Sequence, residues 1–317
     1  MTKSNNKKSK SWSKKVFSFL ISAVIIFFIV KDVFIPNLGE LSSYDWNVNY
    51  WYLFLSIITF LFMWFFKSFV WSKVLNKLNV DITFIESCKV KIYSLMMRYI
   101  PGKVWSLAKG SVMLKSGKVS YKKGFLAMVL DIFYDLYSAA LIFLISLFFI
   151  PEIRNYANIW ILVLIIASIV LLHPKVLSFI IRSGYKLIKK EVDYKFEIPF
   201  SSSLVFVFGY VISWFITSLG LLFMIKGITG VSWLFVFPLT GLFAIAWAIG
   251  FLSIITPSGI GIREGVFGVL LSVYYPLPVA MGLSFLSRII FGLGEIILVS
   301  IIFLYSNIDV IKGYFSS

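Results

Sequence analysis

Arg263 and Glu264 stand side by side as the only charges in a long apolar region of the chain. The 36 residues before them, 227–262, and the 23 after them, 265–287, carry no charge. A guanidinium is a fork-shaped donor that suits phosphate. The neighbouring carboxylate could hold the guanidinium in place, select a cationic headgroup or carry a proton. Charges at membrane depth usually mark function; the alternative is an ion pair that only locks the local turn.

The residues just before this pair interrupt any helix that runs through them. In TPSGIGIREG, residues 256–265, Pro257 removes a backbone donor, and Gly259 and Gly261 permit a tight turn. A half-helix that begins near Ile262 would direct free N–H groups and its positive dipole end at the break, where they favour an anion. The sequence therefore predicts a substrate-binding site made of Pro257, Ser258, Gly259, Gly261, Arg263 and Glu264.

A second Pro-Gly break lies in the first half of the chain. Within MRYIPGKVWSLAKG, residues 97–110, Arg98 and Lys103 flank Pro101 and Gly102. These cations could also bind phosphate, so all four residues join the candidate substrate-binding set. The alternative is that they are ordinary interfacial cations whose side chains extend to the cytoplasm.

Four more charges stand alone in apolar segments. Asp131 and Asp135 are four residues apart and share one helix face. They are either a coupling site or partners of the basic loop nearby. Arg288 needs an anion at its depth in the last predicted helix, which Glu264, Glu295 or a substrate phosphate could supply. Glu295 lies two turns further along the same face and is a third candidate coupling group.

The composition identifies the kind of element that carries these residues. Hydrophobic residues make up 60% of the 317 residues and charged residues only 14%, against about 25% charged in soluble domains. Several apolar runs exceed the ~20 residues that a helix needs to cross a bilayer. The runs do not alternate polar and apolar residues, as strands of a membrane β-barrel do. The sequence predicts an all-α polytopic membrane protein.

Charge and cysteine content exclude several classes of function. The net charge is +16, but the basic residues lie in the loops, where they indicate topology and anionic lipid headgroups as partners rather than nucleic acid. One cysteine, Cys88, and one histidine, His173, allow no disulfide within the chain and no Cys/His metal cluster. We expect no metal and no cofactor.

The apolar runs predict about six full transmembrane helices and two interrupted stretches. Residues 1–15 hold six lysines and no acid and predict a basic cytoplasmic tail. Residues 16–317 then form a single integral membrane domain, which begins with an uncleaved first helix. The predicted spans are 16–35, 50–71, 124–150, 159–181, 201–225 and 279–305. The interrupted stretches are 84–113 and 232–275.

Basic residues set the predicted orientation. Residues 1–15, 72–123 and 173–200 together hold 23 of the 30 lysines and arginines. By the positive-inside rule these segments are cytoplasmic. Both termini are then cytoplasmic, in the plasma (inner) membrane.

With this orientation, the two halves of the chain have the same order of elements but enter the membrane from opposite sides. The stretch 84–113 begins and ends on the cytoplasmic side, whereas 232–275 enters from outside. In each half, about 16–150 and 159–305, two helices precede an interrupted hairpin and one long helix follows. Paired broken helices of opposite orientation are typical of inverted-repeat transporters. The alternative is eight plain helices with a kink at Pro257.

Three motifs resemble one known family. YIPGKVW at 99–105, TPSGIGIREG at 256–265 and SRIIFGLGE at 287–295 are similar to the transmembrane region of lysylphosphatidylglycerol synthase/flippase proteins, and the similarity covers nearly the whole chain. The resemblance implies a lipid-flippase-like module with re-entrant helices. It also implies that the family's signature falls on Pro257, Gly259, Gly261, Arg263 and Glu264, with Arg288 as the downstream arginine.

The chain departs from the full-length enzymes of that family. It ends at Ser317, shortly after the last predicted helix, and the soluble aminoacyltransferase domain does not follow. We therefore expect it to resemble the stand-alone membrane members and not to make lysylphosphatidylglycerol.

Three functions follow from these observations. The first is a flippase or transporter for an anionic phospholipid or a polyprenyl-phosphate-linked glycan. The second is a non-catalytic partner in envelope polysaccharide or lipid assembly, and self-association into a homo-oligomer also stays open. The third is a polyprenyl-phosphate-dependent glycosyltransferase, although no Asp-x-Asp motif occurs. Whether the chain is an enzyme is therefore uncertain from the sequence, which favours a non-enzyme.

Overall fold

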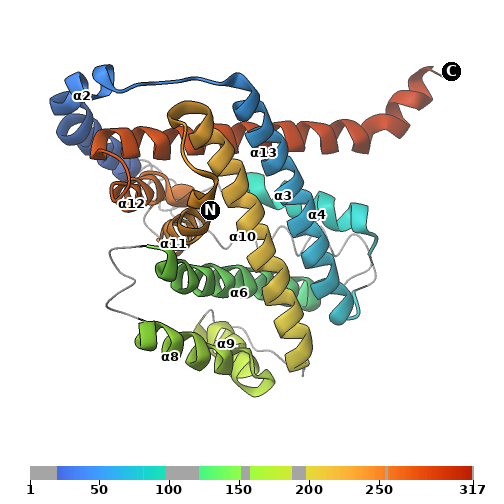
Figure 1. Ribbon diagram of the computed structural model, residues 1–317. Coiled ribbons are helices and arrows are strands. Elements are labelled where there is room, and N and C mark those ends of the chain that lie inside the picture. Colours follow the sequence, from blue (N-terminus) through green and yellow to red (C-terminus); the bar gives the residue numbers. More distant parts are fainter. Residues whose placement is uncertain are drawn as a thin grey trace, which may run out of the picture.

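The computed structural model describes residues 20–80, 82–97, 121–150, 158–187, 198–253 and 256–315. These residues form helices and no strand (Figure 1). The α-helices are α2 (Leu38–Ser43), α3 (Tyr50–Lys77), α4 (Phe84–Met97), α6 (Tyr121–Ser146), α8 (Asn158–Ser168), α9 (Pro174–Leu187), α10 (Phe200–Thr229), α11 (Val236–Leu252), α12 (Ile262–Leu271) and α13 (Leu277–Phe315). Short 3-10 or π segments are η1 (Val30–Phe34), η2 (Ile35–Asn37), η3 (Leu147–Phe149), η4 (Ile169–Leu172), η5 (Trp233–Phe235) and η6 (Pro257–Gly259).

Six of the described helical segments are long and apolar enough to cross a membrane, which confirms the prediction of an all-α polytopic protein. Five of them contain or extend predicted spans, and the sixth, Trp233–Leu252, is the first arm of the predicted stretch 232–275. Helix α12, with ten residues, extends only about 15 Å and is too short to cross alone. The six segments are Leu20–Ser43, Tyr50–Lys77, Lys123–Phe149, Phe200–Thr229, Trp233–Leu252 and Leu277–Leu304.

The predicted span 159–181 is not one straight helix. The chain bends by 76° between Ile159–Leu172 and Pro174–Ser183. Proline disfavours a helical conformation at the residue before it, and His173 is extended, with ψ of 132°. Helix α9 then buries Leu177 and Ile181 against the bundle and exposes Lys175 and Arg182. The segment is therefore a bent pair of helices, and its apolar length alone does not reveal the bend.

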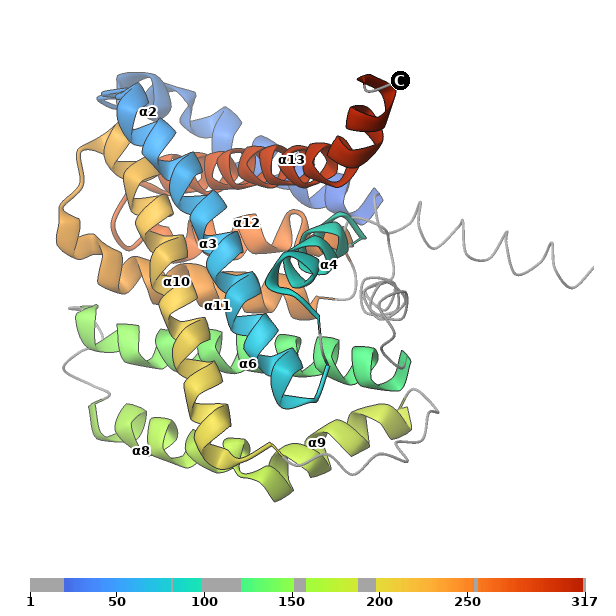
Figure 2. The ribbon, with the colours of Figure 1, turned by 90° about the vertical axis from the view of Figure 1, so that its right-hand side faces the viewer.

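The helices form a stack that is crossed by one long pair. Figure 2 shows α13, α12, α11, α6 and α8 as successive layers, and each layer packs against the next. Helices α3 and α10 run side by side in both views and cross the edge of this stack (Figures 1 and 2). Helix α6 of the first half of the sequence therefore lies between α11 and α8 of the second half.

Small residues bring α3 and α10 close together. The Ser56 hydroxyl donates a hydrogen bond to the Gly220 carbonyl at 2.7 Å. A Cβ on Gly220 would lie 2.8 Å from the Phe60 ring, and a Cβ on Gly209 would lie 2.8 Å from the Val70 side chain. Close approach of small residues is the usual basis of helix association in lipid, where burial from water gives no driving force.

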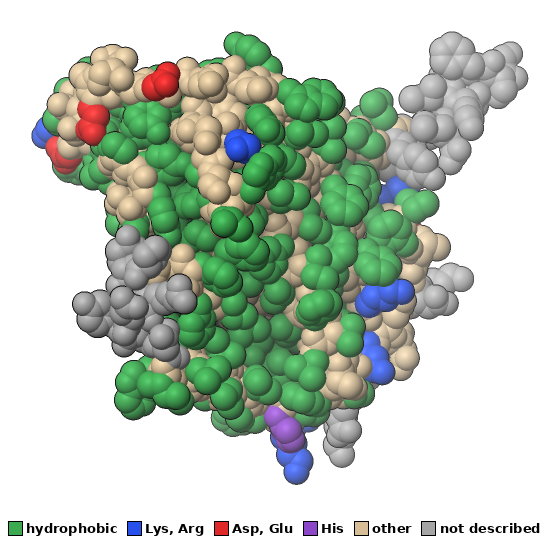
Figure 3. Space-filling model, viewed as in Figure 1, with side chains coloured by type: hydrophobic (Ala, Val, Ile, Leu, Met, Phe, Trp, Pro, Cys, Tyr) green, Lys and Arg blue, Asp and Glu red, His purple; other side chains and the backbone are tan. Residues whose placement is uncertain are grey.

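On the face drawn in Figure 3, the exposed charged side chains lie mostly away from the centre. Figure 3 shows hydrophobic side chains over the centre of one face, acidic side chains near α2 and most Lys and Arg side chains toward the other edges. This distribution matches an apolar band between two aqueous boundaries.

Helices α11 and α6 approach each other closely at Gly241. A Cβ on Gly241 would lie 2.3 Å from the Ser146 Cβ and 3.0 Å from the Phe143 backbone. We expect Gly241→Ala to push the two helices apart and to lower the stability of the bundle by about 1–3 kcal/mol, the usual cost of overpacking. Thermal unfolding of the purified protein in detergent measures the change.

Gly282→Ala is the matched control for this prediction, because nothing lies within 4 Å of the added Cβ. An equal melting temperature for the two variants would contradict the close α11–α6 packing.

Candidate functional site

The break between α11 and α12 is built from glycines where two backbone segments meet. Gly259 and Gly261 have φ of 70° and 86°, a region that favours glycine. A Cβ on Gly259 would lie 2.6 Å from the Gly250 carbonyl oxygen, and a Cβ on Gly250 would lie 2.8 Å from the Arg263 Cβ. Ser258 adopts φ of 53° without being glycine, a conformation that costs about 1–3 kcal/mol. The sequence prediction of a tight turn here is confirmed.

The carboxylate of Glu264 joins the parts of this turn. One oxygen accepts the Gly261 N–H at 2.7 Å. The other lies 3.0 Å from Arg263 Nε and 3.5 Å from Arg288 Nη1. Glu264 is only 2% exposed, so these contacts replace its hydration. Of the anions that the sequence offered for Arg288, the structure places Glu264 against it.

One expectation about the break needs correction. Helix α12 begins at Ile262 as predicted, but the Gly261 N–H at its start is not open to a ligand. Glu264, the third residue of the helix, accepts that hydrogen bond itself. A carboxylate three residues into a helix is well placed to reach back to the first turn. An anion would therefore meet the arginine side chains before it met this backbone group.

Both arginines are fixed by further contacts. The Arg263 guanidinium lies 5.6 Å from the Phe243 ring centroid and 5.9 Å from that of Phe291. Arg288 Nη2 donates to the Ser258 hydroxyl at 3.3 Å. Aromatic faces stabilise a guanidinium by cation–π attraction, so Arg263 keeps a defined position although it is buried.

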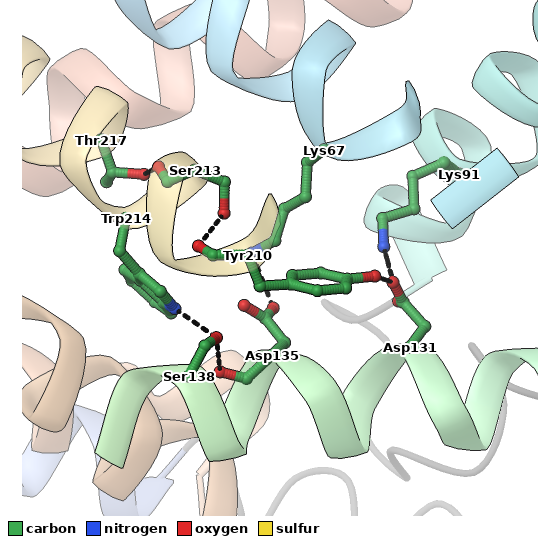
Figure 4. Close-up of polar contacts among 9 residues, drawn as sticks. All are labelled: Lys67, Lys91, Asp131, Asp135, Ser138, Tyr210, Ser213, Trp214 and Thr217. Atoms are coloured by element: carbon green, nitrogen blue, oxygen red, sulfur yellow. Dashed lines mark hydrogen bonds and ion pairs between the residues drawn. The ribbon is translucent and has the colours of Figure 1, made fainter. Parts of the chain in front are cut away.

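A second charged cluster lies on α6. Figure 4 shows Asp131 and Asp135 pointing from one face of α6 toward lysines of two other helices. Lys67 of α3 lies 2.6 Å from Asp135. Lys91 of α4 donates to Asp131, which also accepts a hydrogen bond from the Tyr210 hydroxyl of α10. Of the two alternatives for these acids, pairing with nearby basic residues agrees with Lys91, which lies in the basic segment 72–123, whereas Lys67 comes from a predicted span.

Aromatic rings surround the ammonium of Lys67. The distances from Nζ to the ring centroids are 5.0 Å for Trp214, 5.3 Å for Trp247, 5.8 Å for Trp64 and 5.9 Å for Tyr210. The Asp135 carboxylate completes this group. We call Asp135 and the four rings the cation box.

One cavity of about 130 Å³ connects the two charged clusters. Its charged lining residues include three cations, Lys67, Lys91 and Arg263, and two acids, Asp131 and Asp135. Ser258 from the turn also lines it, together with Trp64, Trp214, Trp247, Phe243 and Phe291. The structure therefore brings residues of α3, α4, α6, α10, α11, α12 and α13 to one polar space inside an apolar bundle.

The remaining predicted site residues either lie outside the described part of the chain or are not among the described residues that line this cavity. Arg98, Pro101, Gly102 and Lys103 lie outside the described residues. Glu295 is 5% exposed on α13 and does not line the cavity as described. Among the described residues, no three His, Cys, Asp or Glu side chains are grouped to hold a metal ion.

Sequence reasoning missed Lys67, Lys91 and Tyr210. Lys67 carried a usable signal, because it is the only charged residue within the predicted span 50–71. Lys91 and Tyr210 carried no such signal, since lysines are common near span ends and tyrosines are common in apolar helices. Only their contacts with Asp131 in the folded bundle reveal their role.

The geometry around Glu264 predicts an order of stability among three variants. Glu264→Gln removes the carboxylate that the buried Arg263 and the partly buried Arg288 share, and loss of one partner of a buried pair costs about 3–5 kcal/mol. Arg288→Gln keeps the Arg263–Glu264 pair and should cost less. The double variant should be more stable than Glu264→Gln alone, because it removes one of the two cations that shared the carboxylate. Thermal unfolding in detergent gives the order.

Additive effects of the two substitutions would contradict this arrangement, because they would mean that Arg288 and Glu264 do not interact.

Comparison with known proteins completes the evidence for the family. The family described as lysylphosphatidylglycerol synthase TM region matches residues 15–293. The match includes every residue that lines the cavity. No curated protein matches the chain. The resemblance seen in the sequence motifs is confirmed, and the chain, an integral membrane protein, belongs to the lysylphosphatidylglycerol synthase transmembrane-region family.

Proposed function

We propose that this protein binds the phosphate-bearing headgroup of an anionic lipid in the cavity and moves it across the membrane. The observation that carries the proposal is the cavity itself, which places three cations and two acids inside an apolar bundle. A lipid headgroup needs such a polar space to cross, while its acyl chains stay in the bilayer. Family membership supports a lipid-related role.

The excess positive charge of the cavity supports an anionic headgroup. Burial of an ion without a partner is strongly unfavourable. Lys67 and Lys91 face Asp135 and Asp131, while Arg263 shares Glu264 with Arg288. Among the described residues that line the cavity there are three cations and two acids, and a phosphodiester carries one negative charge. Arg263 is the group that would meet the phosphate, because it lines the cavity.

The position of the cavity supports transport by movement of helices. Residues of seven helices line this space of about 130 Å³, so movement of these helices would change its size and its access to either side. Rocking of one half of the bundle against the other would open the cavity to each side in turn.

An inverted repeat is the arrangement we propose for these halves. Helices α3, α4 and α6 would correspond to α10, α11 and α13. Four features of the packing support this pairing: α3 packs on α10; α3 contacts α4 as α10 contacts α11; α3 contacts α13 as α10 contacts α6; and α4 contacts α13 as α11 contacts α6. A two-fold axis in the membrane plane would exchange each contact for its counterpart. Both termini would be cytoplasmic, in the plasma membrane.

A glycosyltransferase is less well supported. Sugar transfer usually requires a positioned carboxylate that is available to the acceptor. Both carboxylates that line the cavity, Asp131 and Asp135, are paired with lysines. A role as a non-catalytic partner in lipid assembly predicts no translocation by the purified protein, which the following measurement tests.

Arg263→Gln should lower lipid translocation at least tenfold. The variant keeps the Glu264–Arg288 pair, so its charges balance and folding should persist, but the phosphate loses its cation. The measurement is the flipping of phosphatidylglycerol with a fluorescent acyl chain in proteoliposomes, detected by a membrane-impermeant quencher.

Arg182→Gln is the control, because Arg182 is exposed on α9 far along the chain from the break. Wild-type rates for folded Arg263→Gln would remove Arg263 from the site. No translocation by the wild-type protein would remove the proposed transport function.

The inverted repeat also predicts a topology. The chain from the end of α3 to the start of α6 should begin and end on one side of the membrane. Single cysteines at Lys73 and Tyr121, in a Cys88→Ala background, should therefore react with a membrane-impermeant thiol reagent from the same side. Labelling from opposite sides would contradict the repeat.

A further inference from the structure

We infer that Lys67 fills the cation box as a built-in ligand, so that the cavity accepts phosphodiester lipids without an ammonium group and rejects those that carry one. The inference rests on the proposed function, since it specifies which headgroup the cavity takes. Lys67 is in this view a specificity-determining residue. Its role is to occupy the place that a headgroup ammonium would otherwise take.

The cation box has the features of an ammonium site. Four aromatic rings lie within 6 Å of Lys67 Nζ, and such aromatic groups bind ammonium ligands in other proteins. Asp135 Oδ2 lies 2.6 Å from Nζ, a hydrogen-bond distance that suits a primary ammonium. Asp135 Oδ1 is buried with no hydrogen-bond partner among the described residues, so the carboxylate can accept a second N–H group.

The chain itself already occupies this site. The Lys67 and Asp135 side chains are only 8% and 9% exposed, so the ammonium is enclosed. A lipid amine could enter the box only if Lys67 left it, and Lys67 would then need another anion. Asp131 does not offer one, because it holds Lys91 and Tyr210. Displacement would leave one buried ammonium unpaired, at a large free-energy cost.

A headgroup without an ammonium meets no such obstacle. Its phosphate would face Arg263, and its neutral hydroxyl groups could form hydrogen bonds with Ser258 or Thr217, which both line the cavity. A headgroup with an ammonium would bring a further positive charge into a lining that already has three cations for two acids. Selectivity then arises from repulsion of the wrong headgroup as much as from attraction of the right one.

Binding of two short-chain lipids to the full-length protein in detergent tests the inference. Dihexanoyl-phosphatidylglycerol and dihexanoyl-phosphatidylethanolamine carry the same phosphodiester and acyl chains, and only the second has an ammonium. We expect the wild-type protein to bind the phosphatidylglycerol at least tenfold more tightly. Calorimetric titration gives both affinities. Equal affinities, or tighter binding of phosphatidylethanolamine, would overturn the inference.

Lys67→Ala should reverse the preference, because it empties the box and leaves Asp135 to bind the lipid amine. The double variant Lys67→Ala/Asp135→Asn should lose that gain, since the box is then neutral. Lys73→Ala, on the exposed side of the same helix, should keep the wild-type preference. A folded Lys67→Ala protein that still prefers phosphatidylglycerol tenfold would overturn the inference.

Stabilisation by a small amine tests the inference even if Lys67→Ala lowers the stability of the protein. If the box is an ammonium site, n-propylammonium should raise the melting temperature of this variant more than sodium does at equal ionic strength, because a ligand that binds only the folded state stabilises it. It should not do so for the double variant. Failure of n-propylammonium to stabilise Lys67→Ala would mean that Lys67 is only a structural partner of Asp135.

Translocation of both lipids separates this inference from the proposed function. If the wild-type protein moves both lipids equally and Arg263→Gln moves neither, the transport function stands and the selectivity falls. If the wild-type protein moves neither lipid, the transport function itself is wrong.

Discussion

A charge inside an apolar bundle needs a partner, and this constraint governs the whole interior of the protein. Glu264 shows it most clearly, because its carboxylate holds Arg263, Arg288 and the Gly261 N–H at once. That one carboxylate thus joins two guanidinium groups and the start of a helix. The turn, the start of α12 and the orientation of α13 all depend on this one group.

The same constraint connects α6 to three other helices of the bundle. Asp131 and Asp135 extend from α6, but their partners come from α3, α4 and α10. Each pair thus links helices that are far apart in the sequence across a space that is not filled by apolar side chains. An ion pair can separate and re-form when helices move, provided that another charge replaces the lost partner. A cavity bordered by such pairs combines a stable closed state with the capacity to open.

Close packing supplies the rigidity that the cavity lacks. Glycines let α3 approach α10 and let α11 approach α6, and the resulting layers do not depend on charge. The break between α11 and α12 combines both effects, because Gly250 and Gly259 allow the backbone contact that brings Arg263 to the cavity. Rigid helices around a polar centre are therefore the basis of the proposed transport.

The membrane class, five of the six long helices and the break at Pro257 could be predicted from the sequence, because these depend on apolar length and on local backbone chemistry. Arg263, Glu264 and Arg288 could also be identified, since charges in apolar segments are conspicuous. The 76° bend within 159–181 was not predicted, because the apolar count is insensitive to a bend at Pro174. That Lys67 and Lys91 neutralise the two aspartates is visible only in the folded bundle, because partners from separate helices leave no mark in sequence spacing.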